Sequence, residues 1–357
     1  MNILIVKTSA MGDVIQTLSI LEYLRKKFPD ARIDWVVESQ SLSLLQSYPG
    51  LTHALEMRTK KWKKHLFSLS TYKEIGLFIK QLRSCRYDLL FDLQGNTKSA
   101  FVTGLARAKV KVGFDSSEVR EKGNLLVTDK KIAIPSSLNV CLKYLALVQS
   151  YFKDTSPFVS QGVHLPLSLE EAERLQRALG SLSRSPKIMV CFGSKWKNKQ
   201  LTPSTLLAFL EKVSSRYTPS FLFIFGNRVE QREAETLAGH FSSHSLSLGA
   251  LSLPLWQALM WECDAVITVD SAALHLAGTT TTSSFSVFGP TVPAIYKPLG
   301  AQHIAYQGPC PYGRHFEARC PVLRTCPTGA CIRALSADEL FNRFERDFAV
   351  VQKWYKT

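Results

Sequence analysis

No apolar stretch of the sequence approaches the roughly 20 residues that a membrane-spanning helix needs. The amino terminus also lacks the pattern of a secretory signal, because the apolar run at residues 2–6 is short and no basic residue precedes it. We therefore expect a cytoplasmic protein. In that reducing compartment, the 8 cysteines of the chain would be unusual as a disulfide framework.

Acidic residues are scarce relative to basic ones: 29 Asp and Glu stand against 44 Lys and Arg, which gives a formal net charge of +15. Such an excess favours a polyanionic partner, such as nucleic acid, a phosphorylated glycolipid or an anionic membrane face. The sequence contains no helix-turn-helix, zinc-finger or RNP pattern, so we expect no nucleic-acid partner. The hydrophobic fraction of 45% argues against disorder, and 357 residues suffice for two cores.

The chain has no short-period repeat, but apolar runs alternate with amphipathic segments in each half. In the first half the expected elements are strands at 2–6, 32–37 and 87–91 and helices at 14–27 and from about 97. Residues 154–162 have the composition of a linker. The second half predicts strands at 187–192, 220–225, 265–269 and 285–288 and helices at 203–215 and 338–355. This alternation predicts two α/β domains with parallel sheets.

Gly12 and Asp13 follow the first expected strand, at a strand-to-helix turn. Such turns lie at the carboxyl edge of a parallel sheet, where ligands bind in α/β proteins. Gly12 allows the backbone to turn tightly beneath a ligand. Asp13 can accept the proton of an acceptor hydroxyl as a general base, or it can cap the following helix. The local sequence by itself favours the cap.

Residues 270–275 (DSAALH) open a helix after the strand at 265–269. The amides of a first helical turn suit a diphosphate, which Asp270 and His275 would flank. A capped helix with a satisfied histidine fits the same residues equally well. Two turns of this kind, one in each half, predict two domains that face a shared cleft, one for a phosphorylated donor and one for an acceptor.

The segment after the strand at 187–192 is basic and begins with Gly193 and Ser194, which can bring an amide and a hydroxyl to a phosphate. Lys199 in this segment can neutralise the negative charge that grows as a nucleotide diphosphate leaves. The usual meaning of such a run is a solvated basic loop, and that alternative stays open.

A second basic segment, residues 58–65, places five Arg and Lys around Trp62. It can bind the phosphates or carboxylates of an acidic acceptor. It can also bind nucleic acid, with Trp62 stacked on a base, or be a solvated flexible loop. Residues 92–99 (DLQGNTKS) form another strand-to-helix turn, with Lys98 on the first helical turn, and carry little information alone.

Four cysteines near the carboxyl end, Cys310, Cys320, Cys326 and Cys331, have the spacing C-x9-C-x5-C-x4-C. Because no CxxC pair is present, this is a weak pattern by the standard of zinc ribbons. The thiols lie in a segment rich in Gly, Pro and Arg, which a tetrahedral metal ion could clamp. Free or oxidisable thiols are the main alternative.

Taken in order, these segments resemble the bacterial ADP-heptose:lipopolysaccharide heptosyltransferases, glycosyltransferase family 9, and the amino-terminal half looks closest to heptosyltransferase I. The resemblance spans nearly the whole chain. The motifs that carry it are KTSAMGD at 7–13, the basic tryptophan segment at 58–64, DLQG at 92–95, Lys98, VGFD at 112–115, Arg120, Lys199, the segment 270–275 and FGPT at 288–291.

This resemblance implies a GT-B fold with two Rossmann-like domains facing a central cleft. Residues 1–160 would bind the acceptor and residues 161–336 the donor, and a terminal helix at 337–357 would pack back on the first domain. The resemblance also implies an inverting transfer that requires no cofactor and no catalytic metal. The four clustered cysteines would at most form a structural site.

Carried over by position, the resemblance changes the interpretation of Asp13 from cap to base and makes Lys199 a catalytic residue that also holds the donor diphosphate. The implied donor site comprises Gly12, Ser194, Lys199, Glu230, Asp270, Ser271, Ala272, Ala273 and His275, with Glu230 at the nucleoside. The implied acceptor site is the basic set of Lys60, Lys61, Lys63, Lys64, Lys98 and Arg120.

The function implied is the transfer of heptose from ADP-heptose to a Kdo residue of the lipopolysaccharide inner core, by an enzyme that contacts the inner membrane peripherally. A related ADP-sugar transferase acting on a protein hydroxyl or another glycan is the alternative. The chain departs from the family at Ser271-Ala272, where Thr-Gly is usual, and at Ser283, often a proline. The polar run at 279–284 is also unusual.

Overall fold

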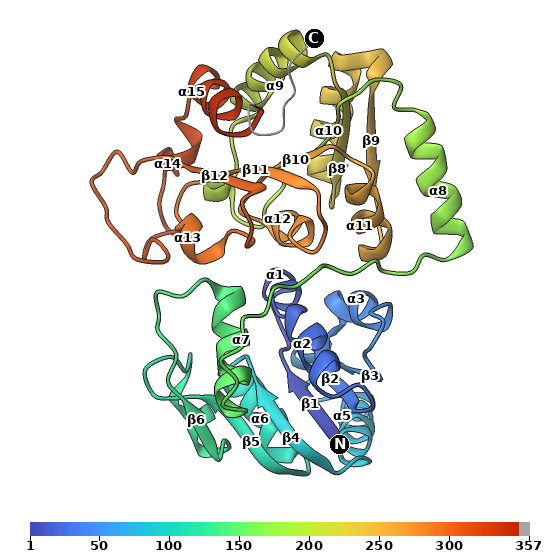
Figure 1. The fold of residues 1–357 in the computed structure, drawn as a ribbon, viewed down its shortest axis with the longest axis vertical. Coiled ribbons are helices and arrows are strands. Elements are labelled where there is room, and N and C mark those ends of the chain that lie inside the picture. The colour runs from blue at the N-terminus through green and yellow to red at the C-terminus, as the bar shows by residue number, and fades with distance from the viewer. Residues whose placement is uncertain (350–357) are drawn as a thin grey trace. The chain divides into compact units, whose positions relative to one another are not determined.

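The computed structural model describes residues 1–349, which form two compact units, Met1–Gln161 and a second unit that begins at Gly162 (Figure 1). The first unit is built on a parallel sheet of 6 strands in the order β3-β2-β1-β4-β5-β6. Its strands are β1 (Asn2–Val6), β2 (Arg32–Glu38), β3 (His53–Met57), β4 (Tyr87–Asp92), β5 (Ala108–Phe114) and β6 (Lys130–Ile132). The central strand β1 is buried because four of its five residues are apolar and face packed helices.

The helices of the first unit are α1 (Met11–Ile15), α2 (Ser19–Lys27), α3 (Leu42–Gln46), α4 (Thr59–Lys64), α5 (Leu69–Arg83), α6 (Thr97–Leu105) and α7 (Val140–Tyr151), with short 3-10 turns at Ser39–Ser41 and Lys122–Leu126. The single helix expected at 14–27 is divided into α1 and α2. Thr17 lies at the break, and its hydroxyl donates to the carbonyl of Asp13 at 2.7 Å. Such a bond back to residue i−4 tends to bend a helix.

The second unit repeats the architecture with a parallel sheet of 6 strands in the order β12-β11-β10-β7-β8-β9. Its strands are β7 (Lys187–Cys191), β8 (Ser220–Phe225), β9 (Ser245–Gly249), β10 (Ala265–Val269), β11 (Ser283–Phe288) and β12 (His303–Gln307). Its helices are α8 (Leu169–Gly180), α9 (Pro203–Tyr217), α10 (Arg228–Phe241), α11 (Leu253–Trp261), α12 (Ala272–Ala277), α13 (Pro293–Tyr296), α14 (Ala330–Arg333) and α15 (Ala337–Arg343). Short 3-10 turns lie at Lys197–Lys199 and Ser242–His244.

The carboxyl-terminal segment differs from the expectation that it would pack on the first domain. α15 continues into a π-helix, Phe344–Ala349, and α15 contacts α9 of the second unit. Phe344 and Phe348 are fully buried, and the ring centroid of Phe344 lies 5.3 Å from that of Phe285 on β11. Apolar residues spaced i, i+4 form one stripe on a helix, and this stripe is buried in the second core. The remaining expected residues, 350–357, lie outside the described part of the chain.

The expected linker at 154–162 lies in a stretch without helix or strand, residues 154–168, and the two units meet in sequence within it. Among residues 1–349, the structure contains no helix of the length and apolarity that a membrane crossing requires.

Candidate functional site

Asp13 lies in α1, just beyond the carboxyl end of β1. Its Oδ2 atom accepts the amide hydrogen of Ala10 at 3.3 Å. Ala10 is the N-cap residue of α1, so Asp13 is not the N-cap itself and caps the helix start from its third position. The same oxygen lies 3.3 Å from a guanidinium nitrogen of Arg120, which is 107 positions away in the sequence. The side chain of Asp13 stays 24% exposed. A carboxylate that is held by a cap and a cation and still reaches solvent can also receive a proton from a bound hydroxyl.

The DLQG motif supports the segment before Asp13. The side-chain oxygen of Gln94 accepts the amide hydrogens of Thr8 and Ser9 at 3.2 and 3.1 Å. Asp92 is fully buried and accepts hydrogen bonds from the amides of Gln94 and Gly95. Its second oxygen accepts hydrogen bonds from the side chains of Thr103 and Asn124 at 2.8 and 2.6 Å. Because both oxygens are occupied, Asp92 is a structural carboxylate, and the motif acts by fixing the backbone at Thr8 and Ser9.

Lys7 is a feature of this site to which sequence reasoning gave no role. Its side chain is fully buried, and its Nζ atom donates to the carbonyl of Leu93 at 3.1 Å and to the hydroxyl of Tyr144 at 2.5 Å. Burial lowers the pKa of Lys7 to about 7, and the negative charge of Asp13 opposes that shift. The available signal was a lysine that directly follows the apolar run at the end of β1.

The predicted basic set does not converge as a single group. Lys98 donates from Nζ to a side-chain oxygen of Glu38 at 2.9 Å and to the Ser9 hydroxyl at 3.3 Å, which places it beside the segment that carries Asp13. Glu38, the last residue of β2, is buried and also accepts a hydrogen bond from the hydroxyl of Thr59. It therefore connects Lys98 on α6 with the start of α4. Lys98 and Arg120 therefore lie at the edge of the sheet with Asp13.

The four lysines of the tryptophan segment lie on a helix, α4, where sequence reasoning left a loop as an alternative. Lys60 donates to the Gln40 side chain at 3.0 Å, and Lys61 pairs with Glu74 at 2.5 Å. Lys63 and Lys64 are exposed. This arrangement forms a cationic surface next to the sheet edge.

Trp62 is buried, with only 6% of its surface exposed, and its ring centroid lies 5.6 Å from that of Phe78. Its indole nitrogen donates to Glu74 at 3.3 Å. An indole held in this way anchors α4 to α5 and is not presented for stacking on a base. The structure thus removes the residue on which the nucleic-acid interpretation of this segment depended.

In the second unit, Asp270 follows β10 and is the centre of a polar cluster. The carboxylate is 5% exposed, pairs with the ammonium group of Lys199 and accepts a hydrogen bond from the Thr291 hydroxyl at 2.5 Å. The Nε2 atom of His275 lies 3.9 Å from the other carboxylate oxygen. Three of the predicted donor residues, Lys199, Asp270 and His275, are therefore brought together, and Thr291 of the FGPT motif joins them.

The first turn of α12 begins at Ser271, and no side chain caps it. Within the described residues, the Ser271 hydroxyl is buried and has no hydrogen-bond partner. The amides of Ala272 and Ala273 follow directly. Because α12 has only 6 residues, its dipole is small, and an anion here would depend on local amide and hydroxyl donors.

Glu230 lies in the first turn of α10, which follows β8, and Ser194 lies in the segment that follows the neighbouring strand β7. Glu230 accepts the amide hydrogen of Gly226 at 2.7 Å. A Cβ atom at Gly193 would stand 2.6 Å from the Glu230 carboxylate, so this approach requires glycine. The carbonyl of Ser194 accepts from the Gln200 side chain at 2.6 Å. Since β10, β7 and β8 are adjacent, all the predicted donor residues except Gly12 lie at one edge of the second sheet.

The polar run at 279–284 is used for packing. The hydroxyl of Thr280 donates to the Ala277 carbonyl at 2.7 Å and that of Thr282 to the Met260 carbonyl at 2.6 Å. The Ser284 hydroxyl lies 2.9 Å from a ring nitrogen of His303, whose pKa burial lowers to about 4. These hydroxyls are satisfied inside the second unit, and this accounts for their presence at positions where apolar residues are expected.

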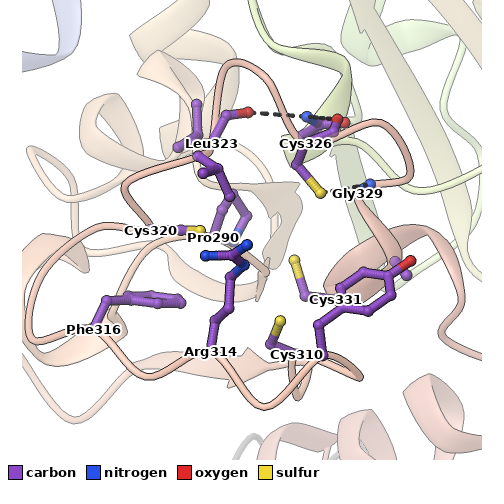
Figure 2. Close-up of a pocket in the computed structure, with 13 residues that line it drawn as sticks. Pro290, Cys310, Arg314, Phe316, Cys320, Leu323, Cys326, Gly329 and Cys331 are labelled. Atoms are coloured by element: carbon purple, nitrogen blue, oxygen red, sulfur yellow. Dashed lines mark hydrogen bonds between the residues drawn. The ribbon is translucent and has the colours of Figure 1, made fainter.

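The four clustered cysteines line one small cavity (Figure 2), and all four are free thiols. Throughout residues 1–349, no group of three or more His, Cys, Asp or Glu side chains has an arrangement suited to a metal ion, which gives no support to the metal interpretation. The loop is tied to the donor residues through Asn198, whose amide donates to the carbonyls of Leu323 and Cys326 at 2.9 Å each. Asn198 directly precedes Lys199.

We expect alkylation by iodoacetamide to modify Cys326 before Cys331. The amide of Gly329 donates to the Cys326 sulfur at 3.4 Å, and such backbone donors lower the pKa of this thiol. Burial, with the neighbouring Cys310 thiol, raises the pKa of Cys331 to about 11. Since the thiolate is the reactive form, Cys326 labelling should level off at a lower pH than Cys331 labelling. Peptide mass spectrometry from pH 6 to 10 checks this, and equal rates throughout would contradict it.

The family model of glycosyltransferase family 9 (heptosyltransferase) matches residues 75–324. The chain belongs to this family. One relative of this family 9 protein is lipopolysaccharide heptosyltransferase 1 of Pseudomonas aeruginosa. The two sequences are 26% identical over 315 residues, and the alignment covers 87% of this chain and 85% of the relative. Lipopolysaccharide heptosyltransferase 1 of Escherichia coli K12 is 25% identical over 311 residues, 87% of this chain and 94% of the relative.

Solved structures of family 9 enzymes show the same fold. The structure of the heptosyltransferase WaaC of E. coli with ADP matches with a TM-score of 0.79 at 22% identity. The match covers 97% of this chain and 100% of the WaaC chain. ADP-heptose lipopolysaccharide heptosyltransferase II of E. coli matches with a TM-score of 0.72 at 17% identity, covering 99% and 100% of the two chains. These likenesses confirm the predicted GT-B fold for this family 9 glycosyltransferase.

Proposed function

We propose that this family 9 glycosyltransferase transfers heptose from ADP-heptose to a Kdo residue of the lipopolysaccharide inner core, with inversion at the anomeric carbon. The relatives named lipopolysaccharide heptosyltransferase 1 support the reaction class, and the solved structures of WaaC with ADP and with ADP-2-deoxy-2-fluoro heptose support the donor. The observation in this chain that carries the proposal is the partly exposed Asp13 carboxylate, held by Arg120 at the end of β1.

In the proposed reaction, the acceptor hydroxyl attacks the anomeric carbon of heptose from the face opposite to the diphosphate. Asp13 takes the hydroxyl proton while the new glycosidic bond forms. The bond from the anomeric carbon to the diphosphate oxygen breaks, and ADP leaves with the electron pair. Because attack and departure occur on opposite faces, the configuration inverts. No step requires a metal ion or another cofactor.

The donor would be held at the edge of the second sheet. Lys199, with the Ser271 hydroxyl and the amides of residues 271–273, would receive the negative charge of the departing diphosphate. Ser194 would line the same site, and Glu230 would contact the nucleoside. Asp270 holds Lys199 in place and is itself held by Thr291. Gly12 would let the donor approach the backbone of α1 closely.

Kdo is a carboxylated sugar, so the acceptor would bind through cations of the first unit. Lys98 and Arg120 lie beside Asp13 and are the best-placed of the predicted basic set. Lys60, Lys61, Lys63 and Lys64 on α4 would contact more distant phosphates or carboxylates of the same glycolipid. This makes a neutral acceptor the weaker alternative.

A transfer assay tests the proposed function. Purified protein is incubated with ADP-heptose and a deacylated, water-soluble Kdo oligosaccharide, and the product is analysed by mass spectrometry and by NMR of the anomeric proton. A heptosylated product of inverted configuration is expected. ADP-heptose binding without transfer to this acceptor would instead favour the alternative, a transferase for a protein hydroxyl or another glycan.

Reversing the charge of Lys60, Lys63 and Lys64 to glutamate should raise the KM for the soluble acceptor by at least about 10-fold, since each charge-assisted contact contributes about 1.5–3 kcal/mol. The dissociation constant of ADP-heptose should stay unchanged. Lys61 is left in place because it pairs with Glu74. The control reverses the exposed Lys122, Lys130 and Lys131, which alters the net charge equally. An equal effect of both triple variants would show that net charge, and not α4, governs acceptor binding.

A further inference from the structure

The first unit exposes a group of large apolar side chains in and just before α5. Leu66 is 51% exposed, Phe67 97% and Leu69 81%, and Tyr72 and Leu77 on α5 are 59% and 67% exposed. These five residues are called the 66–77 patch below. Single exposed apolar residues are common on soluble proteins, but large ones gathered in so short a segment mark an interaction surface.

α5 carries apolar side chains on two opposite sides of the helix. Its inner side packs Phe78 and Leu82 into the core with Trp62. Leu69, Tyr72 and Leu77 are spaced i, i+3 and i+8, which places them together on the outer side. A helix that only covers a core needs one apolar stripe and a polar outer side. The outer stripe of α5 is therefore not explained by packing of the first unit.

Positive charge surrounds this stripe. The exposed Lys63 and Lys64 stand immediately before the patch in sequence, and the exposed Lys73 and Lys80 share the outer side of α5 with it. Glu74 is the single acidic residue between Arg58 and Arg83, and its charge is paired with Lys61. Exposed aromatic and leucine side chains bordered by lysines are typical of helices that lie in the headgroup region of an anionic membrane.

We propose that the 66–77 patch, with the lysines that border it, docks the protein on an anionic lipid bilayer. α5 lies along the membrane plane with Phe67 and Leu69 inserted among the acyl chains nearest the headgroups. A second copy of the chain fits less well, because a symmetric contact would bring the lysines of one patch against those of the other. The docking deepens the proposed function, since it would hold the first unit beside a glycolipid acceptor.

Vesicle co-sedimentation without any acceptor tests the docking. The variant Phe67→Ser/Leu69→Ser is compared with Leu126→Ser/Leu169→Ser, which makes the same kind of change at leucines that are 89% and 79% exposed elsewhere. Wild type and control should bind vesicles of phosphatidylglycerol and phosphatidylcholine, and the patch variant should bind at least about 10-fold more weakly. All three should bind pure phosphatidylcholine weakly, and thermal melts should coincide.

Equal binding of the patch variant and the control would overturn the proposal. Light scattering on a sizing column examines the second-copy alternative: a dimer lost only in the patch variant, with unchanged vesicle binding, would also overturn it. Transfer to the soluble deacylated acceptor should be the same in all three proteins. If that transfer is absent from all of them, the proposed function fails, while the vesicle comparison still decides whether the patch binds membranes.

Discussion

Asp13→Asn should lower kcat by about 10²–10⁴-fold, the loss expected when a positioned general base is removed. ADP-heptose binding should be unchanged, because the predicted donor residues other than Gly12 belong to the second unit. Asparagine has nearly the same shape as aspartate, and its side-chain oxygen can still accept the amide hydrogen of Ala10. The substitution thus removes the proton acceptor and preserves the cap. Steady-state kinetics with the soluble acceptor, beside calorimetry with ADP, measure the two effects separately.

Asp13→Ala is the matched variant, because it removes both the proton acceptor and the cap. The hydrogen bond from the Ala10 amide should contribute about 0.5–1.5 kcal/mol of stability, so Asp13→Ala should melt at a lower temperature than Asp13→Asn. Both variants should be equally slow if Asp13 is the base. If Asp13→Asn keeps wild-type turnover while Asp13→Ala loses stability, the residue is a cap and the base must be sought elsewhere.

The parts of the fold that sequence predicts well are those fixed by local patterns. β1, β8 and β10 have the expected bounds, because each is a short apolar run that ends at a charged residue or a glycine. Thr202 stands directly before Pro203, a sequence pattern typical of a helix start, and its side chain caps α9 by accepting the amide hydrogen of Thr205 at 3.1 Å. Such signals act over a few residues and do not depend on the rest of the chain.

The parts that sequence did not predict depend on contacts between distant residues. Arg120 is 107 positions from Asp13, and Lys98 is 60 positions from Glu38, so neither ion pair follows from local spacing. The same holds for Thr291, which reaches Asp270 from 21 residues away. Resemblance to a family places such residues in one site, but it does not say which of them pair with each other.

Trp62 and the terminal segment show how tertiary packing overrides a local interpretation. A tryptophan among lysines suggests a surface stacking residue, yet Phe78 and Glu74 of α5 bury it. Phe344 and Phe348 are encoded as an apolar stripe, but the sequence does not say which core accepts the stripe. In both cases the burial depends on a partner that is distant in the sequence, and the local pattern leaves that partner undetermined.

Lys199→Ala should weaken ADP binding by roughly 10- to 100-fold, since one charge-assisted hydrogen bond contributes about 1.5–3 kcal/mol. Turnover should fall further, by about 10²–10³-fold, because charge grows on the diphosphate as it leaves. The same change leaves the buried carboxylate of Asp270 without its ammonium partner. An unpaired buried acceptor costs about 1–3 kcal/mol, so a lower melting temperature is also expected. The loss of binding could therefore reflect disorder at the site.

The double variant Lys199→Met/Asp270→Asn separates these causes. It removes both charges, and the asparagine can still accept the Thr291 hydroxyl, so much of the lost stability should return. ADP binding should remain as weak as in Lys199→Ala if Lys199 contacts the diphosphate. If calorimetry instead shows that ADP affinity recovers together with the melting temperature, Lys199 is a structural partner of Asp270. The diphosphate would then be bound by the Ser271 hydroxyl and the amides of α12. The buried ion pair would only hold these groups in position.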